Sequence, residues 1–146
     1  MKFNNISAMV FYILIAIACY LLIYRSDFFP QLDWGTVAIT TVVVALVYIL
    51  FGFFVLKPVD AKHSFSSVAS VFIFLLLVFF ILLFMTLLYD PESFWIMYYV
   101  NFFVVPLQAI SLLGIFIYPV GTAIPSLLMW LGMILRARFL PKEFEL

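Results

Sequence analysis

The polar residues in the last apolar region of the chain are the ones whose spacing could support a function. Asn101, Gln108 and Thr122 are separated by 7 and 14 positions. Because a seven-residue step along an α-helix drifts by only about 20°, the three side chains would form one stripe on a continuous helix. The residues that could line an interaction surface or a path through a membrane are Asn101, Gln108, Ser111, Pro119, Gly121, Thr122 and Pro125.

Each residue type in this set has a known effect inside a membrane. Asparagine and glutamine hydrogen-bond to neighbouring helices, at about 0.6–2 kcal/mol each. Proline removes a backbone donor and leaves a carbonyl available to another partner, and glycine lets a second helix approach closely. Two interpretations stay open: a polar cleft, subunit contact or substrate groove, and ordinary packing contacts inside one bundle.

His63 is the only histidine, and it lies between Asp60 and Ser64 in a short polar segment. A catalytic triad needs its nucleophile, base and acid to be brought together in space. Residues so close in sequence do not form that arrangement, so we interpret the segment as a solvated loop. The sequence has neither a glycine-rich phosphate loop nor Cys/His pairs at metal-binding spacing. We therefore predict no catalytic residue, no metal and no cofactor.

The composition excludes a soluble protein. Of the 146 residues, 68% are hydrophobic and 10% are charged, whereas a soluble domain has about 45–50% apolar and about 25% charged residues. Seven basic residues balance seven acidic ones, so no net charge attracts a nucleic acid. The single cysteine cannot form an internal disulfide. These observations predict an integral membrane protein.

The apolar runs predict how often the chain crosses the membrane. A crossing helix needs about 20 mostly apolar residues. The predicted spans cover residues 6–24, 34–56, 68–89 and 107–135. The first run is longer than the apolar core of a signal peptide, which has about 7–15 residues, so we expect it to remain uncleaved.

The last apolar region, residues 94–135, is long enough for more than one crossing. Aromatic residues crowd its first part: Phe94, Trp95, Tyr98, Tyr99, Phe102 and Phe103. Because Trp and Tyr rings favour the membrane–water interface, we predict an interfacial or re-entrant helix over residues 92–104, which breaks at Pro106. A single long tilted helix, or two separate crossings, are the alternatives.

Basic residues predict the orientation. Cytoplasmic loops carry the excess of lysine and arginine. Four crossings with a cytoplasmic N-terminus leave Arg25 alone outside and put the other six basic residues inside: Lys2, Lys57, Lys62, Arg136, Arg138 and Lys142. Five crossings would divide the basic residues almost evenly. We predict four crossings of the plasma membrane, with both termini cytoplasmic.

The positions of the charges also limit the function. None of the 14 charged residues lies in the middle of a predicted span, whereas proton relays and intramembrane catalytic sites usually use buried ionisable groups. Acidic residues on the predicted outer side could act on a lipid or bind a divalent cation: Asp27, Asp33, Asp90 and Glu92. The simpler interpretation places these acids in loops and at helix N-termini, and we expect no enzyme.

The sequence therefore predicts an all-α polytopic membrane protein that forms a single transmembrane domain over residues 1–146, as a four-helix bundle with an outer interfacial or re-entrant helix. Its loops are too short to fold as domains. The expected function is an accessory, assembly or regulatory component of a membrane complex, which acts through helix–helix contacts. A small permease or channel subunit, with the kinked last helix lining the path, is the alternative. The expected partners are the lipid bilayer and a membrane protein or a second copy of the chain, with no nucleic acid.

Overall fold

The computed structural model describes residues 2–25, 34–57, 59, 64–89, 96–101, 103–107 and 117–139, and all regular structure within these ranges is helical. The long helices are α1 (Lys2–Arg25), α2 (Trp34–Phe54), α3 (Ala69–Leu88) and α6 (Ile117–Phe139). The short ones are η2 (Phe65–Ser67), α4 (Ile96–Val100) and α5 (Val104–Leu107). The four long helices are long and apolar enough to cross a membrane, which is the number predicted from the apolar runs.

The first three long helices cover the first three predicted spans. Helix α6 covers the predicted fourth span only from Ile117, and it continues past residue 135 to Phe139. Residues 108–116, which the prediction placed at the start of that span, lie outside the described residues. Pro125 lies inside α6, where it removes one backbone hydrogen-bond donor from the helix.

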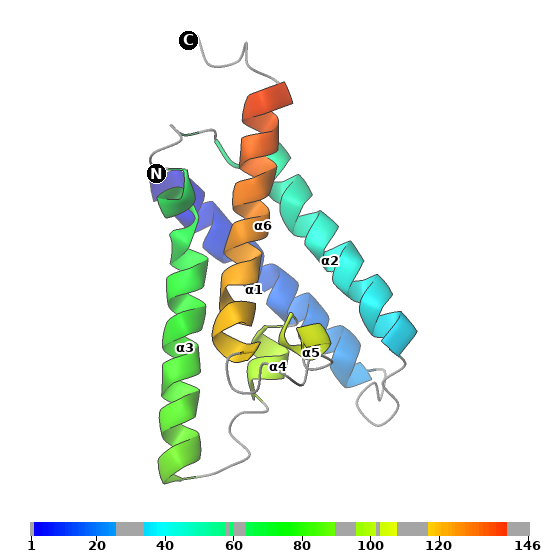
Figure 1. The fold of residues 1–146 in the computed structure, drawn as a ribbon, viewed down its shortest axis with the longest axis vertical. Coiled ribbons are helices and arrows are strands. Elements are labelled where there is room, and N and C mark those ends of the chain that lie inside the picture. The colour runs from blue at the N-terminus through cyan, green and yellow to red at the C-terminus, as the bar shows by residue number, and fades with distance from the viewer. Residues whose placement is uncertain are drawn as a thin grey trace.

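Helix α6 is the centre of the arrangement, because it packs on α2, α3 and α5 and also contacts α1. The start of α1 and the end of α6 lie at the same end of the molecule (Figure 1). The end of α2 and the start of α3 lie there too, as an even number of long helices requires. We call this the basic end, because Lys2, Lys57, Arg136 and Arg138 all lie at it.

The contact between α2 and α6 is made by backbone against backbone. A Cβ atom added at Gly52 would overlap the carbonyl oxygen of Met129, and one added at Gly132 would overlap the carbonyl oxygen of Ile49. The two helices therefore cross at a pair of glycines that face each other. Close approach of this kind is the main source of helix affinity in lipid, where apolar side chains gain little by leaving the lipid tails.

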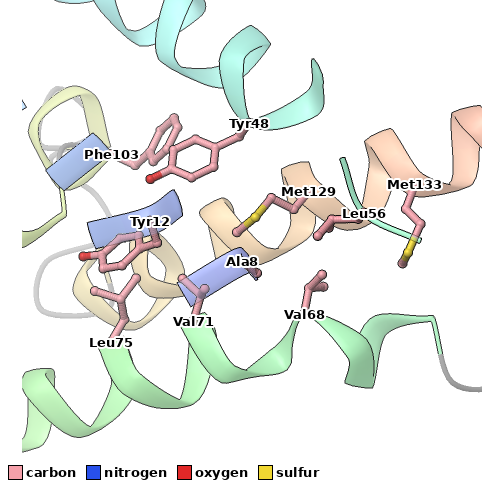
Figure 2. Close-up of a cluster of buried hydrophobic side chains, with 10 residues drawn as sticks. All are labelled: Ala8, Tyr12, Tyr48, Leu56, Val68, Val71, Leu75, Phe103, Met129 and Met133. Atoms are coloured by element: carbon pink, nitrogen blue, oxygen red, sulfur yellow. The ribbon is translucent and has the colours of Figure 1, made fainter. Parts of the chain in front are cut away.

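A buried apolar cluster joins all four long helices (Figure 2). Its buried members are Ala8, Tyr12, Tyr48, Leu56, Val68, Val71, Leu75, Phe103, Met129 and Met133. Outside this cluster, the outward faces of α1, α2 and α3 expose large apolar side chains along their whole length. Such continuous apolar surface is typical of helices that face lipid rather than water.

The segment before the last long helix differs from the prediction. The chain leaves the helical conformation at Asn101, between α4 and α5, whereas Pro106 lies inside α5. Pro106 is the third residue of that short helix, and the first turn of a helix needs no backbone N–H from its residues. Proline is therefore tolerated there, and the predicted break at Pro106 was wrong.

The same segment packs inside the bundle. Met97, Asn101 and Val104 are fully buried, with Phe103 and Val105 nearly so. Residues 92–95 and 102 of the predicted interfacial helix lie outside the described residues. Because the chain is not helical at Asn101, the single stripe expected from Asn101 to Thr122 on a continuous helix does not form.

Candidate functional site

Asn101 lies where the helical conformation is interrupted between α4 and α5, a position that we call the break. Its backbone N–H donates to the carbonyl of Met97 over 2.8 Å, and its own carbonyl accepts from the N–H of Val104 over 3.1 Å. The side-chain oxygen accepts from the N–H of Phe103 at 3.3 Å, a local bond typical of asparagine in turns. Asn101 is only 1% exposed, so these three hydrogen bonds lie inside the protein.

Tertiary packing brings Asn101 next to Gly121, although the two residues do not share a helix. A Cβ atom added at Gly121 would lie 3.5 Å from Asn101 Nδ2 and 3.0 Å from a methyl group of Val104. The neighbouring Thr122 hydroxyl donates to the carbonyl of Pro119 over 2.6 Å, within α6 itself. The glycine therefore provides the space in which the break lies against α6.

The predicted site residues that the structure describes turn inward. Asn101, Gly121, Thr122 and Pro125 are buried, and Pro119 is half-buried. The predictions for Gln108 and Ser111 fall outside the described residues. The four buried residues have almost no exposed surface, so both interpretations of the sequence pattern, a polar cleft and contacts within one bundle, stay open.

A small cavity lies between α1, α2 and the break. Its volume is about 10 Å³ for a water-sized sphere. Apolar side chains such as Ile15 and Val44 form part of its wall, and its polar lining residues are Tyr12, Cys19, Tyr48 and Asn101. The Tyr12 hydroxyl donates to the carbonyl of Val100, which is an end carbonyl of α4 with no partner in its own helix.

Comparison with protein-family models, curated proteins and solved structures finds no match to this chain. The site must therefore be interpreted from its own chemistry. Its groups are two phenols, an amide, a thiol and backbone carbonyls, which are suited to hydrogen-bonding a small neutral molecule. Among the described residues, no group of three or more His, Cys, Asp or Glu side chains could hold a metal ion. The four outer acids Asp27, Asp33, Asp90 and Glu92 lie outside these residues.

The sequence interpretation missed Tyr12 and Tyr48. Tyr12 lies inside the predicted span of residues 6–24, and Tyr48 lies inside the predicted span of residues 34–56. Tyrosine normally collects near the ends of a span, at the headgroup level. A tyrosine about two helical turns inside a span was therefore a usable signal for a buried hydroxyl that needs a partner.

A second group of hydrogen bonds ties the helices together at the basic end. Asn4 is 1% exposed, and its side chain forms two bonds to the backbone of Lys57. Asn4 Nδ2 donates to the Lys57 carbonyl over 2.6 Å, and the Lys57 N–H donates to Asn4 Oδ1 over 3.0 Å. The next residue, Asn5, accepts the backbone N–H of Ser70 at 3.1 Å. The start of α1 thus binds both the end of α2 and the start of α3.

Helix α6 contributes three further side chains to this end. The Trp130 indole donates to the Ser64 hydroxyl over 2.8 Å, and Ser126 donates to the carbonyl of Val68 over 3.1 Å. The Arg136 guanidinium donates to the carbonyl of Phe54, the last residue of α2, over 3.4 Å and to the carbonyl of Leu56 over 3.2 Å. A cation beside the last carbonyls of a helix is favourable, because these carbonyls carry the negative end of the helix dipole.

Proposed function

We propose that this chain is an accessory, assembly or regulatory component of a larger complex in the plasma membrane, and that it contacts its partner through the outward faces of its helices. The inward orientation of the polar residues carries the proposal. Asn101, Gly121, Thr122 and Pro125 are buried, and Asn101 Oδ1 and the Thr122 hydroxyl bond to the backbone of their own chain. Within the described part of the chain, apolar helix faces are therefore the main surface that remains for a partner.

The proposed partner surface is the end of α3. No residue from Leu83 to Tyr89 is buried, and this part of α3 extends beyond the ends of the other long helices (Figure 1). The proposed surface includes the ring of Phe84 in this stretch, which is 59% exposed, and the ring of Phe80 one turn before it, which is 55% exposed. Large aromatic rings are common anchors at protein interfaces. An apolar helix of a membrane protein would complement this surface.

The permease alternative has less support. Its path would follow the proline-containing part of α6, where Gly121, Thr122 and Pro125 are buried. The cavity near the break has room for a volume of only about 10 Å³, which is about the size of one water molecule. A path would therefore need helices from several copies of the chain.

The proposed function is tested by native mass spectrometry of the tagged full-length protein, extracted from its own membrane in a mild detergent. We expect the spectrum to show a different membrane protein bound to this chain at a fixed stoichiometry.

Replacing both Phe80 and Phe84 by alanine should reduce the partner's occupancy at least tenfold, because the two rings are exposed on the proposed surface. The matched variant Leu46→Ala, Leu50→Ala removes equally exposed side chains from α2 and should retain the partner. A homo-oligomer alone, or a bare monomer, would contradict the proposal.

We further propose that both termini are cytoplasmic. The basic end carries Lys2, Lys57, Arg136 and Arg138, while Arg25 lies at the far end of α1. An excess of basic residues marks the cytoplasmic side. Lys2 and Arg138 are exposed, and Tyr89 at the far end of α3 is 74% exposed.

Cysteine labelling tests this orientation on a background with Cys19→Ala. In intact cells, a membrane-impermeant maleimide should label Tyr89→Cys and should leave Lys2→Cys and Arg138→Cys unlabelled. In inside-out vesicles the pattern should reverse. If Arg138→Cys is labelled in intact cells, the cytoplasmic assignment of the basic end is wrong.

A further inference from the structure

The cavity beside the break contains a polar group whose bonding is incomplete. Asn101 lines the cavity, and its Nδ2 has no hydrogen-bond partner within the described part of the chain. Asn101 Oδ1 accepts the N–H of Phe103, and Nδ2 lies near Gly121 of α6, 3.5 Å from where a Cβ of that residue would be. A buried N–H group without a partner is unfavourable, so this amide favours an acceptor.

Two phenols also belong to the lining of this cavity. Tyr12 and Tyr48 line the same cavity from α1 and α2, and each is 2% exposed. Figure 2 shows the ring of Tyr48 extending from α2 toward Phe103 and Tyr12. Because the Tyr12 proton goes to the carbonyl of Val100, the oxygen of Tyr12 can still accept a bond.

The volume and the chemistry select a ligand. A water molecule needs a cavity volume of about 10–15 Å³ and two to four polar partners. This cavity has a volume of about 10 Å³, and its lining includes one amide and two phenols. A cation would need oxygen ligands, whereas the unpartnered group here is a donor. We propose that the cavity is a binding site for one ordered water molecule, which accepts from Asn101 Nδ2 and bonds to the hydroxyls of Tyr12 and Tyr48.

Such a water would complete the hydrogen bonding of the break. The backbone of a non-helical segment inside a membrane protein must be satisfied by the protein itself or by bound water. Here the chain supplies Tyr12 for the Val100 carbonyl, and the water would supply the acceptor for Asn101. The site is independent of the proposed partner surface on α3, so the two proposals can fail separately.

Selective labelling gives a direct test, because the sequence contains only three asparagines, Asn4, Asn5 and Asn101. The full-length protein labelled with ¹⁵N at asparagine side chains, in a deuterated detergent or nanodisc, gives three side-chain amide pairs. The pair lost in Asn101→Leu belongs to Asn101. We expect a cross-peak between the Asn101 amide protons and water. Asn4 is the internal control, because it is equally buried and both ends of its amide are bonded to Lys57.

Two variants separate a bound water from general hydration. Ala16→Leu enlarges a cavity-lining side chain and should abolish the cross-peak, while the Asn101 signal itself remains. Tyr48→Phe keeps the ring and removes one hydroxyl, and it should weaken the cross-peak at least twofold. A folded native protein without the cross-peak, an equal cross-peak at Asn4, or persistence of the signal in Ala16→Leu would each overturn the proposal.

Discussion

Replacing Gly52 or Gly132 by alanine is expected to separate α2 from α6 and to lower the stability of the whole protein. The added methyl group would overlap a backbone carbonyl, that of Met129 at Gly52 and that of Ile49 at Gly132. A backbone atom cannot turn away as a flexible side chain can, so one helix must shift. Overpacking of a tight contact costs about 1–3 kcal/mol, and loss of the glycine contact adds to this cost because close packing drives helix association in lipid.

The measurement is the free energy of unfolding in detergent, from a denaturant titration followed by circular dichroism. Gly35→Ala is the matched control, since Gly35 is exposed in the first turn of α2. That variant should be neutral or slightly stabilising, because alanine is the better helix former. Gly121→Ala should be intermediate, because the added methyl group meets only side-chain atoms of Val104, Asn101 and Leu107. Equal stability of Gly52→Ala and Gly35→Ala would disprove the backbone contact between α2 and α6.

The second large effect is expected at Asn4. Leucine has nearly the same size but cannot bond to the backbone of Lys57, so Asn4→Leu leaves the N–H and the carbonyl of Lys57 without their partner. Unsatisfied groups of this kind cost about 1–3 kcal/mol in total. The start of α1 should then separate from the end of α2.

Hydrogen–deuterium exchange measures this separation. In Asn4→Leu, we expect the amides around Lys57 to exchange at least tenfold faster, with a smaller change at the opposite end of the bundle. Asn101→Leu is the matched comparison, because both asparagines are 1% exposed. Its side chain has one internal bond, the 3.3 Å contact with Phe103, so the loss of unfolding free energy should be smaller. A greater loss in Asn101→Leu would mean that the break, and not the basic end, dominates stability.

Several features were predictable because they depend on local composition. A run of about 20 apolar residues is long enough to cross a membrane whatever its neighbours do, so the number of long helices followed from the sequence. An even number of such helices places the start of α1 and the end of α6 at one end of the molecule (Figure 1). Burial of Asn101 and Thr122 also agrees with the tendency of polar residues in membranes to turn inward.

The break itself was not predictable from local rules. Proline is the usual signal for the end of a helix, yet Pro106 lies in the first turn of α5, while Asn101 ends α4. Asn101 can occupy that position because Tyr12 binds the adjacent carbonyl of Val100 from a position 88 residues earlier in the chain. No window of sequence around Asn101 contains that partner.

The same reason applies to the helix contacts. Gly52 and Gly132 resemble any other glycine in an apolar run, and only the crossing of α2 and α6 makes each of them necessary. Likewise, Asn4 is one of two adjacent asparagines near the N-terminus, and only the tertiary structure brings its side chain to the backbone of Lys57, to which it forms two hydrogen bonds. Hydrophobic length is a property of one segment and can be counted in the sequence. Which faces meet depends on the fit between segments far apart in the chain, and the tertiary structure alone decides it.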